Sequence, residues 1–401
     1  MSAQTTYDPK TDELHLRDYA EMMGKYIGVC VPASSMNIAN DNDKYAQKIY
    51  TEFNAVVAEN EMKMDALQPN QGQFNYGNGD KLVAFAKRHN MKVRGHTLCW
   101  HSQVPKWISE DGYQNNKNYT RANLLSILKR HITSVMRHYK GKVAEWDVVN
   151  ETLDDNQWGV SLSNGRYNLR QSIWVKVIGE DFLDSAFTWA HRIDPDAKLY
   201  LNDYGADFYG GSKATAMYNL VKRMKDDGVP IDGVGLQCHL SSGDAVEGIA
   251  KNARFYKQKL GIDCIITELE LKAGASTSAN LSKQAEAYRK ILEGFLTNSN
   301  APTMMLWGID DNHTWIEGDQ NPLIFDKNLQ PKPAYYSLLE AFHNGYVTDI
   351  HQPWAEYSAS AAVDDAVYDI SGRKVADSLE EFSADGNSGI FIHNHKKFIQ
   401  R

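Results

Sequence analysis

The sequence predicts a (β/α)8 barrel, a ring of eight parallel strands covered by helices, followed by a short β-rich tail. Short apolar runs alternate with longer helical patterns along most of the 401 residues, which indicates repeated βαβ units and a parallel sheet. There are eight such repeats, as a closed barrel requires, and polar residues collect at the same end of every expected strand. A doubly wound open sheet, built from the same units, is the alternative fold.

Each expected strand is a short run of apolar and β-branched residues bounded by turn-forming residues. The eight runs are KYIGVCV from Lys25, NAVVAEN from Asn54, KVRGHTLCW from Lys92, AEWDVVNE from Ala144, KLYLNDY from Lys198, GVGLQCHL from Gly233, CIITELEL from Cys264 and MMLWGID from Met304. The amphipathic stretches after Thr120, Glu180 and Ser282 predict helices between the strands.

The composition and periodicity of the sequence change after the last helical pattern, which predicts three parts in the chain. Residues 1–345 form the barrel. Residues 346–365 are polar, contain Ala and Ser and show no periodicity, which predicts a linker. Residues 366–401 carry short strand patterns around a Ser-Gly turn and predict a small β-type tail. So few residues bury little surface, so we expect the tail to dock on something or to be loosely ordered.

Composition excludes several classes of protein. The 43 Lys and Arg against 51 Asp and Glu give a net charge of −8, which argues against a nucleic-acid partner. The longest apolar runs are too short to span a membrane, and the polar start predicts no secretion signal in this chain. The cysteines are far apart and lack metal-ligand spacing, which predicts buried free thiols at Cys30, Cys99, Cys238 and Cys264.

Polar and ionisable residues follow the apolar runs at the end where a barrel carries its catalytic groups. They are Glu59, Asn60, His96, His101, Asn150, Glu151, Asn202, Asp203, Gln237, His239, Glu268 and Trp307. Glu151 and Glu268 end or lie late in very apolar strands, where an unpaired carboxylate is costly. Either one alone is explained by a salt bridge. Together, on the fourth and seventh strands, they form the carboxylate pair that glycosidic bond cleavage needs.

That chemistry requires two different carboxyl groups, one holding a proton for the leaving oxygen and one ionised. Asn150 is placed to hydrogen-bond a sugar hydroxyl. His239 is placed to hydrogen-bond Glu268 and keep it ionised, although a histidine in the core is an equally good explanation of that residue.

Several ordered motifs resemble those of glycoside hydrolase family 10, the retaining endo-β-1,4-xylanases. The resemblance covers about Asp12 to Tyr346. The motifs are AENEMK from Ala58, GHTLCWHSQVPKW from Gly95, WDVVNE from Trp146, LNDY from Leu201, VGLQCHL from Val234, ITEL from Ile266, WG at Trp307 with Trp315, and PLIFDKNLQPKPAY from Pro322.

The resemblance implies Glu151 as acid/base and Glu268 as nucleophile. It implies substrate binding by Glu59, Asn60, Lys63, His96, Trp100, His101, Gln103, Asn150, Tyr204, Gln237, His239, Trp307 and Trp315. It implies xylan and xylo-oligosaccharides as substrates, no metal or organic cofactor, a monomer, and a secreted, cell-surface or periplasmic location. A β-1,4-glucanase or cellobiosidase on the same frame, and a non-catalytic polysaccharide-binding barrel, are the alternatives.

Three positions depart from the family pattern. Glu270 stands where an Asp is usual, which is expected to alter how His239 is held. Gly205 replaces an Asn after the NDY motif, so a contact on the leaving side of the substrate is expected to be absent. Asp310 and Asp311 follow Trp307, and we expect a solvated loop charge there, with tuning for charged side groups as the alternative.

The tail carries a weaker resemblance. VYDISGRKV from Val367 and GIFIHNHKKFIQR from Gly389 are similar to a C-terminal module of secreted Bacteroidetes proteins. That resemblance implies a secretion or anchoring signal.

Overall fold

The computed structural model describes residues 7–108 and 119–351, and in the tail residues 367–369, 374–376, 382, 389–393 and 396–400. The chain divides into two compact units, Met1–Ala341 and Phe342–Arg401. Among the described residues, no helix has the length and apolar character to cross a bilayer.

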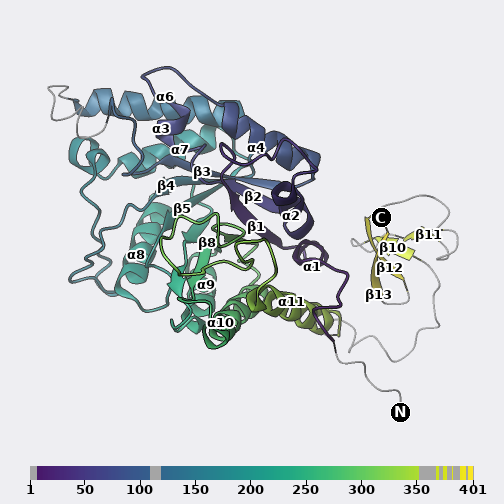
Figure 1. The fold of residues 1–401 in the computed structure, drawn as a ribbon. Helices are drawn as coiled ribbons and strands as arrows, with labels where there is room; N and C mark the ends of the chain where they lie inside the picture. Colours follow the sequence, from purple (N-terminus) through teal and green to yellow (C-terminus); the bar gives the residue numbers. More distant parts are fainter. Residues whose placement is uncertain are drawn as a thin grey trace, which may run out of the picture. The chain divides into compact units, whose positions relative to one another are not determined.

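The first unit is a closed parallel barrel (Figure 1). Its strands are β1 Tyr26–Val31, β2 Ala55–Ala58, β3 Lys92–Cys99, β4 Glu145–Asn150, β5 Lys198–Asp203, β6 Gly233–Leu236, β8 Asp263–Lys272 and β9 Thr303–Leu306. Strand β1 pairs in parallel with both β2 and β9, and β6 pairs with β8. Because the ring has no open edge, the (β/α)8 prediction is confirmed and the open sheet is excluded.

The prediction of one continuous sixth strand is wrong, because the structure has two short strands in its place. Strand β6 ends at Leu236, and β7, His239–Ser241, begins after a break. At the break Cys238 has a φ of 60°, and its N–H donates to Asp207 Oδ1 at 3.0 Å instead of continuing the ladder. Strand β7 then pairs with the late part of β8, which sets His239 opposite Glu270.

Helices follow the strands and cover the outside of the barrel (Figure 1). They are α1 Leu16–Met22, α2 Lys44–Glu52, α3 Met64–Leu67, α4 Gly77–Arg88, α6 Arg121–Tyr139, the π-helix η1 Trp174–Ile178, α7 Phe182–Ile193, α8 Ser212–Asp226, α9 Glu247–Leu260, α10 Ser278–Leu296 and α11 Pro333–His351. The helices predicted after Thr120 and Glu180 are confirmed. Helix α10 begins earlier than predicted, because the Thr277 hydroxyl accepts from Asn280 N–H and caps it.

Charged side chains inside the barrel are paired with one another. Arg94 is buried, contacts Asp147 and donates to Glu145 Oε2 at 3.1 Å. Asp147 Oδ2 lies 2.9 Å from His96 Nδ1. Pairing offsets the cost of burying these charges, and the chain of contacts fixes His96 at the base of the cleft described below. The cysteines are buried and unpaired as predicted.

The second unit contains an antiparallel sheet in the order β11-β10-β12-β13. Its strands are β10 Val367–Asp369, β11 Lys374–Ala376, β12 Gly389–His393 and β13 Lys396–Gln400. Val367, Ala376 and Phe382 form a small buried cluster. Helix α11 continues to His351, so the first residues of the predicted linker 346–365 are helical, whereas residues 352–365 lie outside the described part.

Candidate active site

A cleft of about 690 Å³ opens at the C-terminal ends of the barrel strands. The residues that line it come from strands and from the loops that follow them, far apart in the sequence. They are Glu59, Asn60, Lys63, His96, Trp100, Gln103, Asn150, Glu151, Tyr204, Gly205, Asp207, Phe208, Gln237, His239, Leu240, Glu268, Trp307 and Trp315. The structure thus brings the predicted site residues together, except that His101 is not among the lining residues, although its Nδ1 lies 3.8 Å from Glu151 Oε2.

Glu268 lies within β8 and is buried. Its Oε1 accepts a hydrogen bond from Asn202 Nδ2 at 2.7 Å, and its Oε2 lies 3.1 Å from His239 Nε2. Burial raises the pKa of Glu268, but the hydrogen bond from His239 and the charges of His96 and His239 outweigh it and hold the pKa at about 2. The carboxylate is therefore ionised at neutral pH.

His239 bridges two carboxylates, because its Nδ1 lies 2.6 Å from Glu270 Oε1. Burial lowers the pKa of His239, yet the hydrogen bonds to Glu268 and Glu270 raise it to about 10. Both ring nitrogens are then donors. Trp315 Nε1 donates to the same Glu270 oxygen at 2.9 Å. The longer side chain of Glu270 thus still reaches the histidine and also holds Trp315.

Glu151 is the first residue after β4 and has a φ of 53°, in the left-handed region. This conformation is costly for a residue with a side chain and needs support from its surroundings. Its N–H donates to Asn202 O at 2.8 Å, and its carbonyl accepts from Arg170 Nε at 3.2 Å. Its Oε1 accepts from Gln237 Nε2 at 3.1 Å. The turn therefore aims the carboxyl group into the cleft.

Three amide side chains connect the two glutamates. Asn202 Nδ2 donates to Asn150 Oδ1 at 2.9 Å as well as to Glu268. Gln237 Nε2 lies 3.2 Å from the same Asn150 oxygen and also donates to Glu151. The two carboxyl groups are therefore fixed relative to one another within one rigid network. Sequence reasoning placed Asn202 at a strand end but did not give it this bridging role.

One end of the cleft is formed by residues that follow β2 and β3. Asn60 Oδ1 accepts from Lys63 Nζ at 3.0 Å and from Gln103 Nε2 at 3.1 Å. Lys63 Nζ also lies 5.0 Å from the Trp100 ring centroid. Burial raises the pKa of Glu59 beside them. This end offers a cation, amides and a carboxyl group, which suit the hydroxyl groups of a sugar.

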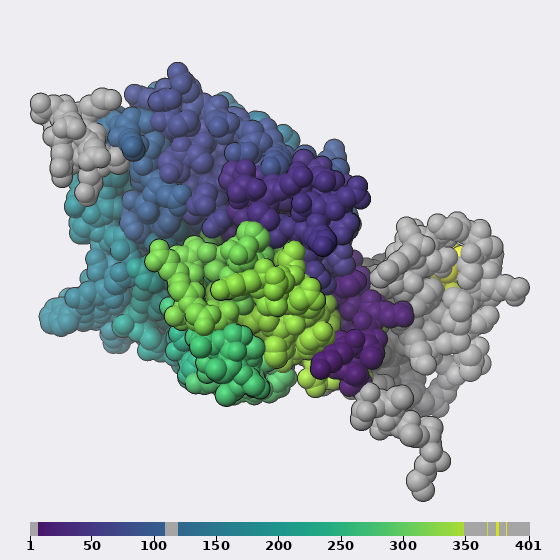
Figure 2. Space-filling model, in the orientation of Figure 1, coloured from purple at the N-terminus to yellow at the C-terminus, as the bar shows by residue number. Residues whose placement is uncertain are grey.

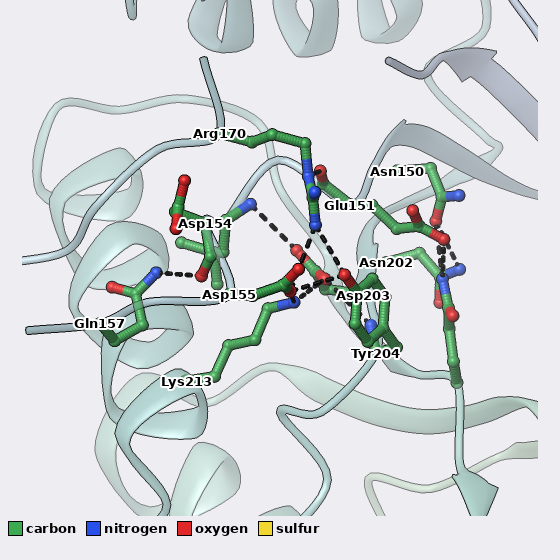
Figure 3. Close-up of polar contacts among 12 residues, drawn as sticks. Asn150, Glu151, Asp154, Asp155, Gln157, Arg170, Asn202, Asp203, Tyr204 and Lys213 are labelled. Carbon is green, nitrogen blue, oxygen red and sulfur yellow. Dashed lines mark hydrogen bonds and ion pairs between the residues drawn. The ribbon is translucent and has the colours of Figure 1, made fainter. Parts of the chain in front are cut away.

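The opposite end is held by a network that links the turn after β4 to the end of β5 (Figure 3). Arg170 donates to Tyr204 Oη at 2.8 Å and to Asp155 Oδ1 at 3.3 Å. Lys213 Nζ lies 2.9 Å from Asp155 Oδ1 and 3.0 Å from Asp203 Oδ1. Burial raises the pKa of Asp203 to about 7 against the charge of Lys213. The sequence motifs gave no signal for Arg170, Asp155 or Lys213.

The expectation of a solvated charge after Trp307 is wrong. Asp310 and Asp311 are both buried. Asp310 Oδ2 pairs with His313 Nδ1 at 2.8 Å, and Asp311 Oδ2 pairs with Lys332 Nζ at 2.8 Å. Both carboxylates therefore stabilise the loop after β9 and do not line the cleft.

Gly205 lines the cleft with a φ of 67°, and the absence of a substrate contact at this position stays a prediction. Asp207, Phe208 and Leu240 also line the cleft and were not predicted. Their nearness to the ends of β5 and β6 is the only signal that the sequence offered for them.

Comparison with known proteins gives a consistent result. The sequence profile described as "Glycosyl hydrolase family 10" matches residues 15–341. Endo-1,4-beta-xylanase A of Thermoanaerobacterium saccharolyticum is 41% identical over 322 residues, which are 78% of this chain and 26% of that protein. Exoglucanase XynX of Acetivibrio thermocellus is 40% identical over 322 residues, 78% of this chain and 28% of that protein. The chain thus spans about a quarter of the length of these two relatives.

A solved structure matches over almost its whole length. It is a mutant of TsXylA, an intracellular xylanase from Thermoanaerobacterium saccharolyticum, in complex with xylotriose. The TM-score is 0.74 at 38% sequence identity, and the match covers 82% of this chain and 99% of that one.

Proposed function

We propose that this chain, which belongs to glycosyl hydrolase family 10, is an endo-1,4-β-xylanase that hydrolyses internal bonds of xylan with retention of configuration. One observation carries the proposal. Two glutamates, one directly after β4 and one within β8, line one cleft, and Glu268 is held ionised by His239 while Glu151 contacts an amide. This is the asymmetry that a glycosidase with two catalytic carboxyl groups requires.

In the proposed mechanism Glu268 attacks the anomeric carbon as Glu151 gives its proton to the departing glycosidic oxygen. The bond to that oxygen breaks, and a covalent glycosyl-enzyme forms on Glu268. Glu151, now ionised, takes a proton from water as the water oxygen attacks the same carbon. The ester bond to Glu268 breaks, and the sugar leaves with its original configuration. Asn202 and His239, which bond Glu268, keep its two oxygens oriented during both steps.

We assign the proposed sugar-binding roles according to where each residue lies along the cleft. Glu59, Asn60, Lys63 and Gln103 hold the sugar on the non-reducing side of the cleaved bond, supported by their shared contacts at Asn60. Trp100 and Trp307 flank the sugar at the cleavage point with His96, His101, Asn150, Gln237 and His239, and Trp315, which is exposed, overhangs the cleft. Tyr204 lies on the leaving side.

The test is digestion of xylan followed by product sizing and proton NMR. We expect a fall in viscosity that runs ahead of reducing-sugar release, and the β-anomer as the first product. Appearance of the α-anomer first would contradict retention, and release of single sugars from chain ends would contradict internal cleavage.

A second candidate is a β-1,4-glucanase or cellobiosidase, which the 40% identity to an exoglucanase favours. Rates on aryl β-xylobioside and aryl β-cellobioside decide between the two. We expect the xylobioside to be the better substrate by at least about tenfold, because a hydroxymethyl group has to displace side chains in a packed site. A protein that binds xylan and releases no reducing sugar would instead be the non-catalytic barrel.

We also propose that the enzyme acts outside the cytoplasm as a monomer, with residues 366–401 as a secretion or anchoring module. The part of the proposal that concerns residues 366–401 is supported by their place in a second compact unit with a sheet of its own. Export of a reporter fused to residues 366–401 and light scattering of the full chain test the two parts. Retention of the reporter inside the cell, or a dimeric mass, contradicts them.

A further inference from the structure

The loop between β4 and η1, residues 151–173, carries the most exposed of the large apolar side chains in the described part of the chain. Trp158 is 84% exposed, and Leu162 on the same loop is 49% exposed. In Figure 2 a blue-green projection, the colour of residues near 160, stands out from the body of the first unit. An indole held in water on a projecting loop suggests a contact with a flat partner surface.

Hydrogen bonds preorganise this loop. The buried side chain of Gln157 donates to the carbonyls of Asp154 at 2.6 Å and Asn168 at 2.8 Å, and accepts from Asn168 N–H at 2.8 Å. Asn168 Nδ2 donates to Trp158 O at 3.3 Å. The Trp158 backbone is therefore fixed before any ligand binds, which lowers the entropy cost of binding.

The loop is continuous with the leaving side of the cleft. Asp155 accepts from Tyr204 Oη at 2.5 Å, and Tyr204 lines the cleft. Figure 3 shows Asp155 and Tyr204 between Glu151 on one side and Gln157, with its hydrogen bond to Asp154, on the other. Trp158 is three positions after Asp155 in the sequence, a backbone reach of at most about 11 Å. The indole is thus close enough to serve sugars beyond the one at Tyr204.

We infer that Trp158 is a stacking platform for a xylose residue on the leaving side of the substrate, further along the chain than the sugar at Tyr204. This inference rests on the proposed function. The indole face matches the apolar C–H face of a pyranose ring, and an uncharged sugar chain needs no counter-charge on the loop. The platform strengthens the binding of long substrates and favours cleavages that leave several sugars on that side.

The experiment compares Trp158→Ala, Trp158→Phe and the matched control Leu162→Ala on xylo-oligosaccharides of increasing length and on aryl β-xylobioside. The aryl substrate occupies only the non-reducing side and the first leaving position. For Trp158→Ala we expect unchanged kcat/KM on aryl xylobioside and a loss of about tenfold on the longest oligosaccharides. Trp158→Phe recovers most of the loss, and Leu162→Ala matches the wild type at every length.

A uniform loss at all lengths, or no loss at any length, overturns the platform. So does an equal loss in Leu162→Ala, which would assign the effect to the loop as a whole. Failure of the wild type to hydrolyse aryl xylobioside contradicts the proposed function itself, so the two failures are distinguishable.

Discussion

The surroundings of Glu268 and Glu151 differ in charge, in burial and in backbone conformation. Glu268 lies inside a strand, its side chain is 6% exposed, and a cationic His239 bonds it. Glu151 lies past the end of a strand, is 13% exposed and contacts the neutral amide of Gln237. Burial and the charge of Arg170 lower the pKa of His101 beside Glu151, so that histidine is neutral at neutral pH. The comparison shows that one cleft places its two glutamates in different surroundings, and that the cation beside Glu268 keeps this carboxylate ionised.

The largest expected effect is at Glu268. Glu268→Ala removes the atom that bonds to carbon, so xylan hydrolysis should fall on the order of 10⁵-fold or more. Reducing-sugar release measures the loss, and thermal unfolding checks that the variant is folded. Glu286→Ala, on the exposed face of α10, is the control and should keep full activity. Hydrolysis that survives in Glu268→Ala would remove the nucleophile from the proposal.

Glu151→Ala should produce a smaller and more selective loss. Xylan kcat/KM should fall by about 10² to 10⁴, the range for one general acid/base. Aryl xylobiosides with good leaving groups should lose little in the bond-breaking step, because they need little protonation. A series of aryl leaving groups measures this dependence. An equal loss for every leaving group would show that Glu151 does not donate the proton.

His239→Gln directly tests the difference in charge between the surroundings of Glu268 and those of Glu151. Loss of the cation raises the pKa of Glu268 from about 2, so the acid limb of kcat/KM should move up by about 1 to 3 pH units. The pH profile on aryl xylobioside measures it. His138→Gln, on α6, pairs with Asp80 outside the cleft and serves as the control. An acid limb that stays in place would contradict the assignment.

The same variant should change the pH dependence of stability. In the wild type the contribution of Glu268 is present above its unfolded pKa of about 4.3 and is lost as pH falls toward 2. The contribution of His239 is present below its unfolded pKa of about 6.5 and is lost as pH rises through 10. The difference in unfolding free energy between wild type and His239→Gln should therefore be largest between about pH 4.3 and 6.5.

The smallest expected effect concerns the support of Glu151. Arg170→Lys keeps the charge but cannot donate at once to Glu151 O, Tyr204 Oη and Asp155. We expect about a tenfold loss on xylan and little change on activated aryl xylobioside, because Arg170 acts through the position of Glu151. Arg223→Lys on α8, which pairs with Asp184, is the control. Equal loss on both substrates would show that Arg170 supports the whole cleft.

The barrel and the two glutamates were predictable because their signals are local. Runs of apolar residues mark each strand. The carboxyl ends of all strands meet at one face of a closed parallel barrel, so residues at those ends are expected to lie together. The charge at Asp311 was misjudged because nothing nearby in the sequence indicates Lys332, the partner that Asp311 meets only after folding. Asp310 differs, because its partner His313 is only three residues away and was overlooked. The break at Cys238 was missed for the same reason as the charge at Asp311, because its cause is a bond to Asp207.

The sequence by itself determined the order of the strands, the residues at their carboxyl ends and the chemical types available to the cleft. Tertiary structure alone decided which of those residues touch. Asn202 reaches both Asn150 and Glu268 because β5 pairs with β4 in one register and the ring closes through β6 and β8. A hydrogen bond requires the distance between donor and acceptor to be correct within a few tenths of an ångström. Only the register of the folded strands sets such distances between residues that are remote in the chain.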